Sequence, residues 1–162
     1  MTDIRAVFIG ERMVSDFALD AGALLAENGL ETAVVISLFT DRRAEPDDPL
    51  PAEATDRRGW WGDVSPPIVN GRPVEGSRLG SRLWLLSREK QLQSVVERAR
   101  TYCAEALAWM IEDGVCERVD VEAEIVRTGV LGVGITIYRP DADAVSFRFD
   151  YAWQGQERSA AQ

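Results

Sequence analysis

The stretch from Ser87 to Asp113 reads SREKQLQSVVERARTYCAEALAWMIED and carries the most regular pattern in the chain. Its apolar side chains recur every three or four residues, which is the spacing of one face of an α-helix. Serine is a common helix N-cap, and Asp113-Gly114 is a normal helix C-terminus. The pattern therefore predicts one long amphipathic helix over 87–113, with its apolar side in the core. The members of this apolar stripe are Leu92, Val95, Val96, Ala99, Tyr102, Cys103, Ala106, Leu107, Met110 and Ile111.

The residues after this helix alternate between apolar and polar side chains, as half-buried strands do. The alternation covers 119–125, 133–137 and 145–151, and Pro140-Asp141 opens a turn. Three consecutive antiparallel strands packed on one long helix define an α+β fold. We expect a single domain over residues 1–153 and a polar, disordered tail over 154–162.

The residues before residue 40 give a less regular pattern. Short strands at 4–8 and 12–14 flank Gly10-Glu11 and suggest a hairpin. The stretch 30–39 is ambiguous, because Val34, Val35 and Ile36 favour a strand whereas Leu30, Val34 and Leu38 have helical spacing.

Between residues 40 and 80 no period is sustained, and six of the seven prolines fall there. Structureless connections of this length are uncommon in compact domains and tend to be functional. Tryptophan and arginine, the residue types that dominate binding hot spots, cluster in and just after this stretch. We therefore predict a long irregular Pro/Gly/Trp/Arg-rich loop that serves assembly rather than chemistry. The clustered residues are Arg57, Arg58, Trp60, Trp61, Arg78, Arg82 and Trp84.

The charge is distributed unevenly along the chain. The net charge is -9, yet residues 41–90 hold nine basic and nine acidic side chains, so the remaining residues carry the whole excess. An acidic body argues against binding to nucleic acid, which requires neutralisation of phosphates, and against docking on anionic membranes. No apolar run is long enough to span a bilayer, no secretory leader is visible, and two reduced cysteines are expected.

The chain contains no histidine. Histidine-dependent nucleophiles and His-ligated zinc are therefore excluded, and two isolated cysteines cannot complete a zinc site. No phosphate-binding G-x-x-x-x-G-K-[ST] loop occurs. We expect no metal, no cofactor and no small-molecule substrate.

Four motifs in order resemble those of one known family. They are ISLFTDRRA at 36–44, RGWWGD at 58–63, GSRLW at 80–84 and ALAWMIEDGV at 106–115. Together they resemble the small baseplate protein of Mu-like contractile-tailed phages, over residues 14–153. That family is similar to the lysozyme-like small baseplate-wedge subunits of contractile tails. The resemblance favours a helix at 30–39.

The resemblance implies a structural protein of the virion tail baseplate, assembled in the host cytoplasm. It implies contacts with the larger wedge protein, with other baseplate proteins and with the first ring of the tail sheath. The wedge subunits carry a Glu-Pro-Arg motif after the long helix, and the matching place here contains Glu117 and Arg118 without the proline. The unit GSRL is also doubled, at 76–79 and 80–83, and the second copy matches the family because Trp84 follows it.

These observations define a candidate partner interface. Its members are Asp41, Arg42, Arg43, Arg57, Arg58, Trp60, Trp61, Asp63, Arg82, Trp84, Glu117 and Arg118. The alternatives are that Trp60 and Trp61 close the core of the domain itself and that Arg82 anchors the loop onto its own helix.

Two other functions remain open. One is a carboxylate-dependent peptidoglycan hydrolase acting during phage entry, for which Glu112 with Asp113, or Glu122 with Glu124, are formally available. Nothing in the sequence sets one of these carboxyl groups in an apolar pocket, so we expect no enzymatic activity. The other is a bacterial regulator or adaptor built on the same fold.

Overall fold

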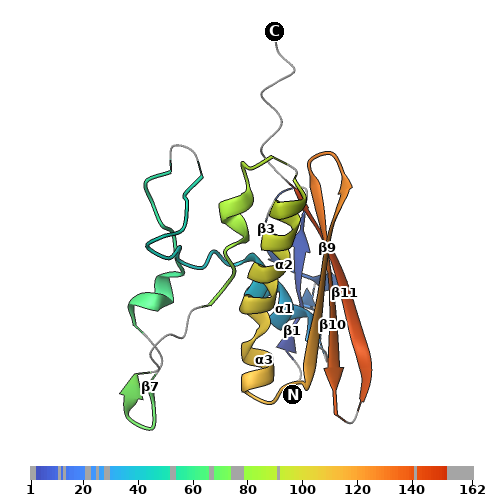
Figure 1. The fold of residues 1–162 in the computed structure, drawn as a ribbon. Helices are drawn as coiled ribbons and strands as arrows, with labels where there is room; N and C mark the ends of the chain where they lie inside the picture. The colour runs from blue at the N-terminus through green and yellow to red at the C-terminus, as the bar shows by residue number, and fades with distance from the viewer. Residues whose placement is uncertain are drawn as a thin grey trace.

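A three-stranded sheet, two helical segments and a long loop surround a shared core in the computed structural model (Figure 1). The three long strands stand on one side in Figure 1, helix α2 lies along them, and the loop lies on the other side of α2. The structure describes residues 3–10, 12, 14–20, 23–24, 26–27, 30–51, 54–65, 68–73, 79–90, 92–140 and 142–152.

The helix that the sequence pattern predicts forms the centre of the domain. Helix α2 (Gln93–Leu107) is followed by α3 (Trp109–Glu112), and Ala108 between them keeps helical backbone angles. The apolar stripe from Val95 to Met110 is buried as predicted, whereas Leu92 and Ile111 at its two ends are exposed. Gly114 (φ 69°) ends the helix, and the Val115 amide donates to the Met110 carbonyl. This is the C-terminus that the Asp-Gly pair indicated.

The predicted start of the helix at Ser87 is wrong. The chain instead forms a short 3-10 turn, η2 (Leu83–Leu86), whose four apolar side chains are all buried, and Ser87 ends that turn. The α-helix begins six residues later, after Leu92 in an extended conformation and without a side-chain cap. Burial of four consecutive apolar residues requires the chain to change direction there, and this requirement overrides the local preference of serine for a cap.

The strands after the helix form the predicted antiparallel sheet, in the order β11-β10-β9. Their bounds are Arg118–Arg127 for β9, Val130–Arg139 for β10 and Ala142–Ala152 for β11. Residues that pair across the sheet share a face, so Val133 with its partners Ala123 and Phe149 points into the core. The opposite face carries Glu124 and Arg148, which form an ion pair. The α+β class is therefore confirmed.

The N-terminal part packs beside this core. Helix α1 (Glu31–Phe39) occupies the ambiguous stretch and buries Val34, Val35 and Leu38, so the helix favoured by the family resemblance is confirmed. The expected hairpin forms from β2 (Ala6–Ile9) and β3 (Val14–Phe17), although its second strand begins at Val14 rather than at residue 12. Two-residue strands pair nearby: β1 (Asp3–Ile4) with β6 (Ala26–Glu27), and β4 (Leu19–Asp20) with β5 (Ala23–Leu24).

The predicted irregular loop over 40–80 contains little regular structure in its described part. A 3-10 turn, η1 (Trp61–Val64), and a small hairpin of β7 (Ile68–Val69) and β8 (Arg72–Pro73) are its regular elements there. Arg78 and the tail over 154–162 lie outside the described residues. In the described part of the chain, no helix has the length and apolarity needed to cross a membrane. Cys103 and Cys116 are both buried and free, as expected.

The position of Leu107 provides a test of the core. Its side chain is fully buried on α2, so Leu107→Ala should lower the free energy of unfolding by about 2–5 kcal/mol through lost contacts and a residual cavity. Ile111→Ala, at the half-exposed end of the same stripe, is the matched control and should cost less than about 1 kcal/mol. Urea unfolding of both variants makes the comparison, and equal losses would place Leu107 outside the core.

Candidate functional site

The two ends of the irregular loop are joined at its base. Asp41 and Ser81 form a parallel bridge, in which the Arg42 amide donates to the Ser81 carbonyl at 3.0 Å. The Ser81 amide donates to the Thr40 carbonyl at 2.9 Å. Gly80 allows this approach: its φ is +100°, and a Cβ there would lie 2.2 Å from the Thr40 carbonyl oxygen. The loop therefore leaves the body and returns to it at one point.

Arg82 fastens the loop to the helix. Its Nη1 donates to both carboxylate oxygens of Asp48 at 3.0 Å, and its Nη2 donates to Glu105 on α2 at 2.7 and 2.9 Å. The guanidinium also lies over the ring of Tyr102, 4.6 Å from its centroid. Burial disfavours the charge of Arg82, but hydrogen bonds to Glu105 and Asp48 outweigh it and raise its pKa above the ordinary value. We call Arg82, Asp48 and Glu105 the arginine clasp.

Trp84 is a core residue that contacts groups at the surface of the site. Its side chain is buried, and its indole nitrogen donates to the Arg42 carbonyl at 2.8 Å. The Arg58 guanidinium stacks on the Trp84 ring, 4.5 Å from the centroid, and its Nη1 pairs with Asp41 at 2.7 Å. A cation on an indole face gains electrostatically from the ring quadrupole. Trp84 therefore positions Arg58 at the surface.

The remaining arginines of the loop bond to backbone carbonyls. Arg57 donates to the carbonyls of Glu45 and Pro46, and Arg43 donates to the carbonyl of Arg58 at 3.2 Å. Arg58 itself has a left-handed backbone (φ 52°), which is uncommon for a non-glycine residue. These bonds hold two distant parts of the loop together, so its conformation is set by its own side chains.

The two adjacent tryptophans of the loop pack on each other, with 4.9 Å between their ring centroids, but differ in exposure. Trp60 is half-buried and lies over Gly62, where a Cβ would be 1.8 Å from its ring. Trp61 is 81% exposed. Asp63 fixes this turn, because its carboxylate accepts a hydrogen bond from the Trp60 amide at 3.2 Å and its own amide donates to the Trp60 carbonyl. Of the two tryptophans, only Trp61 offers most of its surface to a partner.

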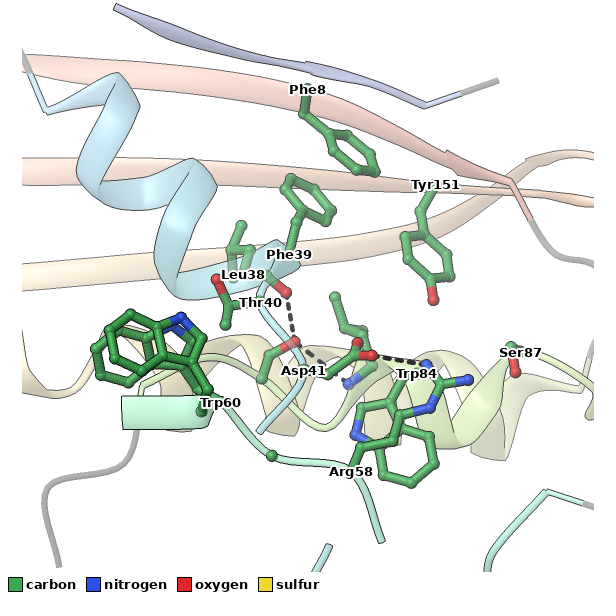
Figure 2. A pocket seen from close by; sticks show the side chains of 14 residues that line it. Phe8, Leu38, Phe39, Thr40, Asp41, Arg58, Trp60, Trp84, Ser87 and Tyr151 are labelled. Carbon is green, nitrogen blue, oxygen red and sulfur yellow. Dashed lines mark hydrogen bonds and ion pairs between the residues drawn. The ribbon is translucent and has the colours of Figure 1, made fainter. Parts of the chain in front are cut away.

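A pocket of about 480 Å³ opens where these groups meet (Figure 2). Arg58, Asp41 and Trp84 lie along one wall in Figure 2, with Trp60 at one end. The opposite wall is formed by Phe8, Phe39 and Tyr151, which come from β2, α1 and β11. Phe8 and Phe39 stack with 3.5 Å between ring centroids. Burial raises the pKa of Tyr151, so its hydroxyl stays protonated at neutral pH and can donate a hydrogen bond.

Two of the sequence-predicted site residues lie elsewhere. Glu117 and Arg118 are at the start of β9, where the Glu117 amide bonds to the Tyr138 carbonyl. Arg118 lies 3.9 Å from the Tyr138 ring centroid and pairs with Asp120 at 3.2 Å. The other predicted residues all belong to the loop site, either at its pocket or among the contacts that brace it.

Some residues of the site were not identified from the sequence. Phe8, Phe39 and Tyr151 are remote in sequence from the loop, and no local pattern indicates that they meet it. Nothing in the sequence distinguishes Asp48 and Glu105 from the other acidic residues.

The site combines aromatic side chains with a few polar and charged groups. Asp41 is the one carboxylate residue that lines this pocket, and Asp150 is the one that lines a second pocket beside β11. In the described part of the chain, His, Cys, Asp and Glu side chains do not gather in groups of three or more as metal ligands would. The arrangement provides aromatic walls, a cation and a carboxylate, which suits recognition of a polypeptide.

Comparison with known proteins identifies the class to which this domain belongs. The model of the family described as "Phage protein GP46" matches residues 30–144, and the chain therefore belongs to that family. It is 42% identical to the baseplate protein gp46 of Escherichia phage Mu over 155 residues, which cover 96% of this chain and 99% of the relative. It is 36% identical to the Mu-like prophage FluMu protein gp46 of Haemophilus influenzae over 138 residues, 85% of this chain and 89% of the relative. The assignment to the Mu-like phage baseplate proteins, and with it to the virion tail, is confirmed.

Proposed function

We propose that this protein is a wedge subunit of a contractile tail baseplate, related to the lysozyme-like small wedge subunits. In this role it contacts the larger wedge protein and the first ring of the tail sheath. The observation that carries the proposal is the loop site, a neutral surface rich in Trp and Arg that is fixed in place before any partner binds. A preformed contact surface lowers the entropy lost on association.

The loop site and the sheet would make different kinds of contact. The Arg58 guanidinium donates one N–H to Asp41, and its other guanidinium N–H groups have no acceptor among the described residues. They are therefore available to a partner's carboxylate or carbonyl groups. In the described sheet, β9 and β11 each pair only with β10, so their outer edges present backbone groups to which an extended segment could add. We infer that strand addition supplies affinity and that the loop site supplies specificity.

We further propose that the protein acts without catalysis, and that its partners are proteins rather than nucleic acids, membranes or small molecules. Glycoside hydrolysis requires two carboxylates about the scissile bond, separated by roughly 5–9.5 Å. Glu112, Asp113, Glu122 and Glu124 are all exposed, and none lines either described pocket.

The absence of hydrolysis can be measured directly. Purified protein incubated with peptidoglycan should release no soluble fragments above a buffer control, because each of the two pockets described above is lined by one carboxylate, whereas the reaction requires two. Turnover that disappears in a Glu122→Gln or Glu112→Gln variant would establish the hydrolase instead.

The assembly role of the loop is tested by Arg58→Ala combined with Trp61→Ala. The Trp61 residue is 81% exposed and the Arg58 side chain is 48% exposed, and an exposed ion pair contributes about 0–1 kcal/mol, so the melting temperature should stay close to that of the wild type. Truncated hot-spot residues typically cost an interface about 2 kcal/mol or more. The variant should therefore fail to co-elute with co-expressed neighbouring tail proteins in size-exclusion chromatography.

A control double variant removes an arginine and a large apolar side chain from another surface. Arg100→Ala with Ile111→Ala deletes an exposed arginine and an exposed large apolar side chain from the central helix. This control should assemble like the wild type. Normal assembly of the loop variant, or its unfolding, would show that Arg58 and Trp61 do not form the contact.

A further inference from the structure

The guanidinium of Arg58 is placed like that of Arg82, but it is paired with one carboxylate fewer. In the arginine clasp, Arg82 lies over the Tyr102 ring, 4.6 Å from its centroid, and each of its terminal nitrogens donates to a different carboxylate. Arg58 lies over the Trp84 ring, 4.5 Å from its centroid, and donates to Asp41 through one terminal nitrogen. The Arg58 side chain is 48% exposed, and its other guanidinium N–H groups have no acceptor among the described residues. Arg58 therefore keeps free the kind of donors that Arg82 uses on its second carboxylate.

The backbone of Arg58 is held in an unfavourable conformation. Its φ of 52° lies in the left-handed region, and the other described non-glycine residue with a positive φ is Asn70, a residue type that tolerates it. The Arg58 amide donates to the Asp56 carboxylate at 2.9 Å, and the Arg58 carbonyl accepts from Arg43 at 3.2 Å. Strained residues persist only where their surroundings fix them, and they cluster at ligand-binding sites. The loop thus fixes the direction in which the free N–H groups of Arg58 point.

The pocket beside Arg58 supplies further hydrogen-bond donors. In Figure 2 the Tyr151 hydroxyl points into the pocket, toward the pair of Asp41 and Arg58. Ser87, which the sequence pattern assigned to a helix cap, lines the end of the pocket opposite Trp60. Asp41 is already paired with Arg58, so the donors that remain face no carboxylate of this pocket. Hydroxyl and guanidinium groups donate to carboxylates, and the polar part of the pocket therefore favours an additional carboxylate.

A second carboxylate next to Asp41 requires a cation between the two. Arg58 can fill this role, because the arginine clasp holds one guanidinium between two carboxylates in the same way. The aromatic walls lower the local dielectric, which strengthens charge-assisted hydrogen bonds. The rings of Phe8, Phe39 and Trp60 in these walls also favour an apolar side chain next to the carboxylate. The volume of about 480 Å³ lies in the range of about 300–1,000 Å³ that is typical of binding pockets.

We propose that this pocket receives an aspartate or glutamate side chain from a loop of another tail protein. The carboxylate binds the free N–H groups of Arg58, and an apolar side chain next to it packs among the rings of Phe8, Phe39 and Trp60. The occupant is a side chain rather than a chain end, because side-chain carboxylates complete the same geometry at Arg82. The inference rests on the proposed function and deepens it by stating which chemical group the loop site recognises.

The test uses the fact that Lys90 is the only lysine of this chain. The variant Arg58→Lys/Lys90→Arg keeps the total charge and moves the single side-chain amine to the pocket. A carbodiimide activates a carboxylate, and an amine in contact with it then forms an amide as the carbodiimide leaves as a urea. In assembled tails treated in this way, the lysine introduced at position 58 should become joined to another tail protein. Mass spectrometry should place the amide on an Asp or Glu side chain of that protein. Reaction with Asp41 joins two residues of one chain and is distinguished by the same spectra.

A matched control moves the amine to another surface. Arg100 lies on α2, is paired with Glu97 alone and lines neither of the two pockets. Arg100→Lys/Lys90→Arg should give about tenfold less of the interprotein amide or an even lower yield, because no pocket holds a partner's carboxylate there. In a second measurement, Arg58→Glu should enter tails about tenfold less efficiently than the wild type or worse, since it places three carboxylates together and removes a hot-spot arginine.

The outcomes separate this proposal from the proposed function. Tails that contain the Arg58→Lys/Lys90→Arg chain without an interprotein amide overturn the proposal. An amide on a chain end or on a second copy of this chain overturns it too, as does equal yield from the Arg100 control or normal entry of Arg58→Glu. The proposed function is tested by whether the wild-type chain is present in tails, which is measured in parallel.

Discussion

The arginine clasp is the contact on which the arrangement of the loop depends. Arg82 is held at 15% side-chain exposure between two carboxylates, one from the loop and one from the central helix. Removing one member of such a partly buried network leaves the other charges without compensation, which is costly. The Asp48 carboxylate also accepts a hydrogen bond from the Glu45 amide, so it orders the turn at these residues. Arg57 holds the same turn by donating to the carbonyls of Glu45 and Pro46. Arg82 thus ties a segment with almost no regular structure to the central helix.

This arrangement explains how an acidic protein presents a neutral contact surface. The nine arginine and lysine side chains of 41–90 balance nine acidic ones, and many of these charges are used on the loop itself. What remains at the surface is Arg58 on its tryptophan support, the aromatic pocket beside it and the exposed Trp61. A surface of this composition resembles the centre of a protein interface, where aromatic residues and arginine are enriched and other charges are depleted.

The sequence could predict the parts of the fold in which one face of an element is buried over many residues. The helix from Val95 to Met110 and the strand from Val133 to Ile137 are of this kind, because burial imposes a period that can be counted. Ser87 was misassigned because the burial of Leu83–Leu86 is a tertiary requirement that a capping preference does not reveal. The Trp and Arg residues of the loop were found from composition alone. Their pocket was not, because Phe39 and Tyr151 reach it from segments more than a hundred residues apart, and the partners of Arg82 depend on the same packing.

The central claim is that Arg82 orders the loop before any partner binds, and amide hydrogen exchange of the free subunit tests it most directly. The amides of Arg42, Ala44 and Ser81 donate within the loop and its base, so they should be protected in the wild type. In Arg82→Met, which keeps much of the apolar stem and removes the guanidinium, these amides should exchange about tenfold faster or more, corresponding to a loss of about 1.4 kcal/mol or more. Amides of β10 should be unchanged in the same sample. Equal protection of the loop amides in the variant and the wild type would contradict the account.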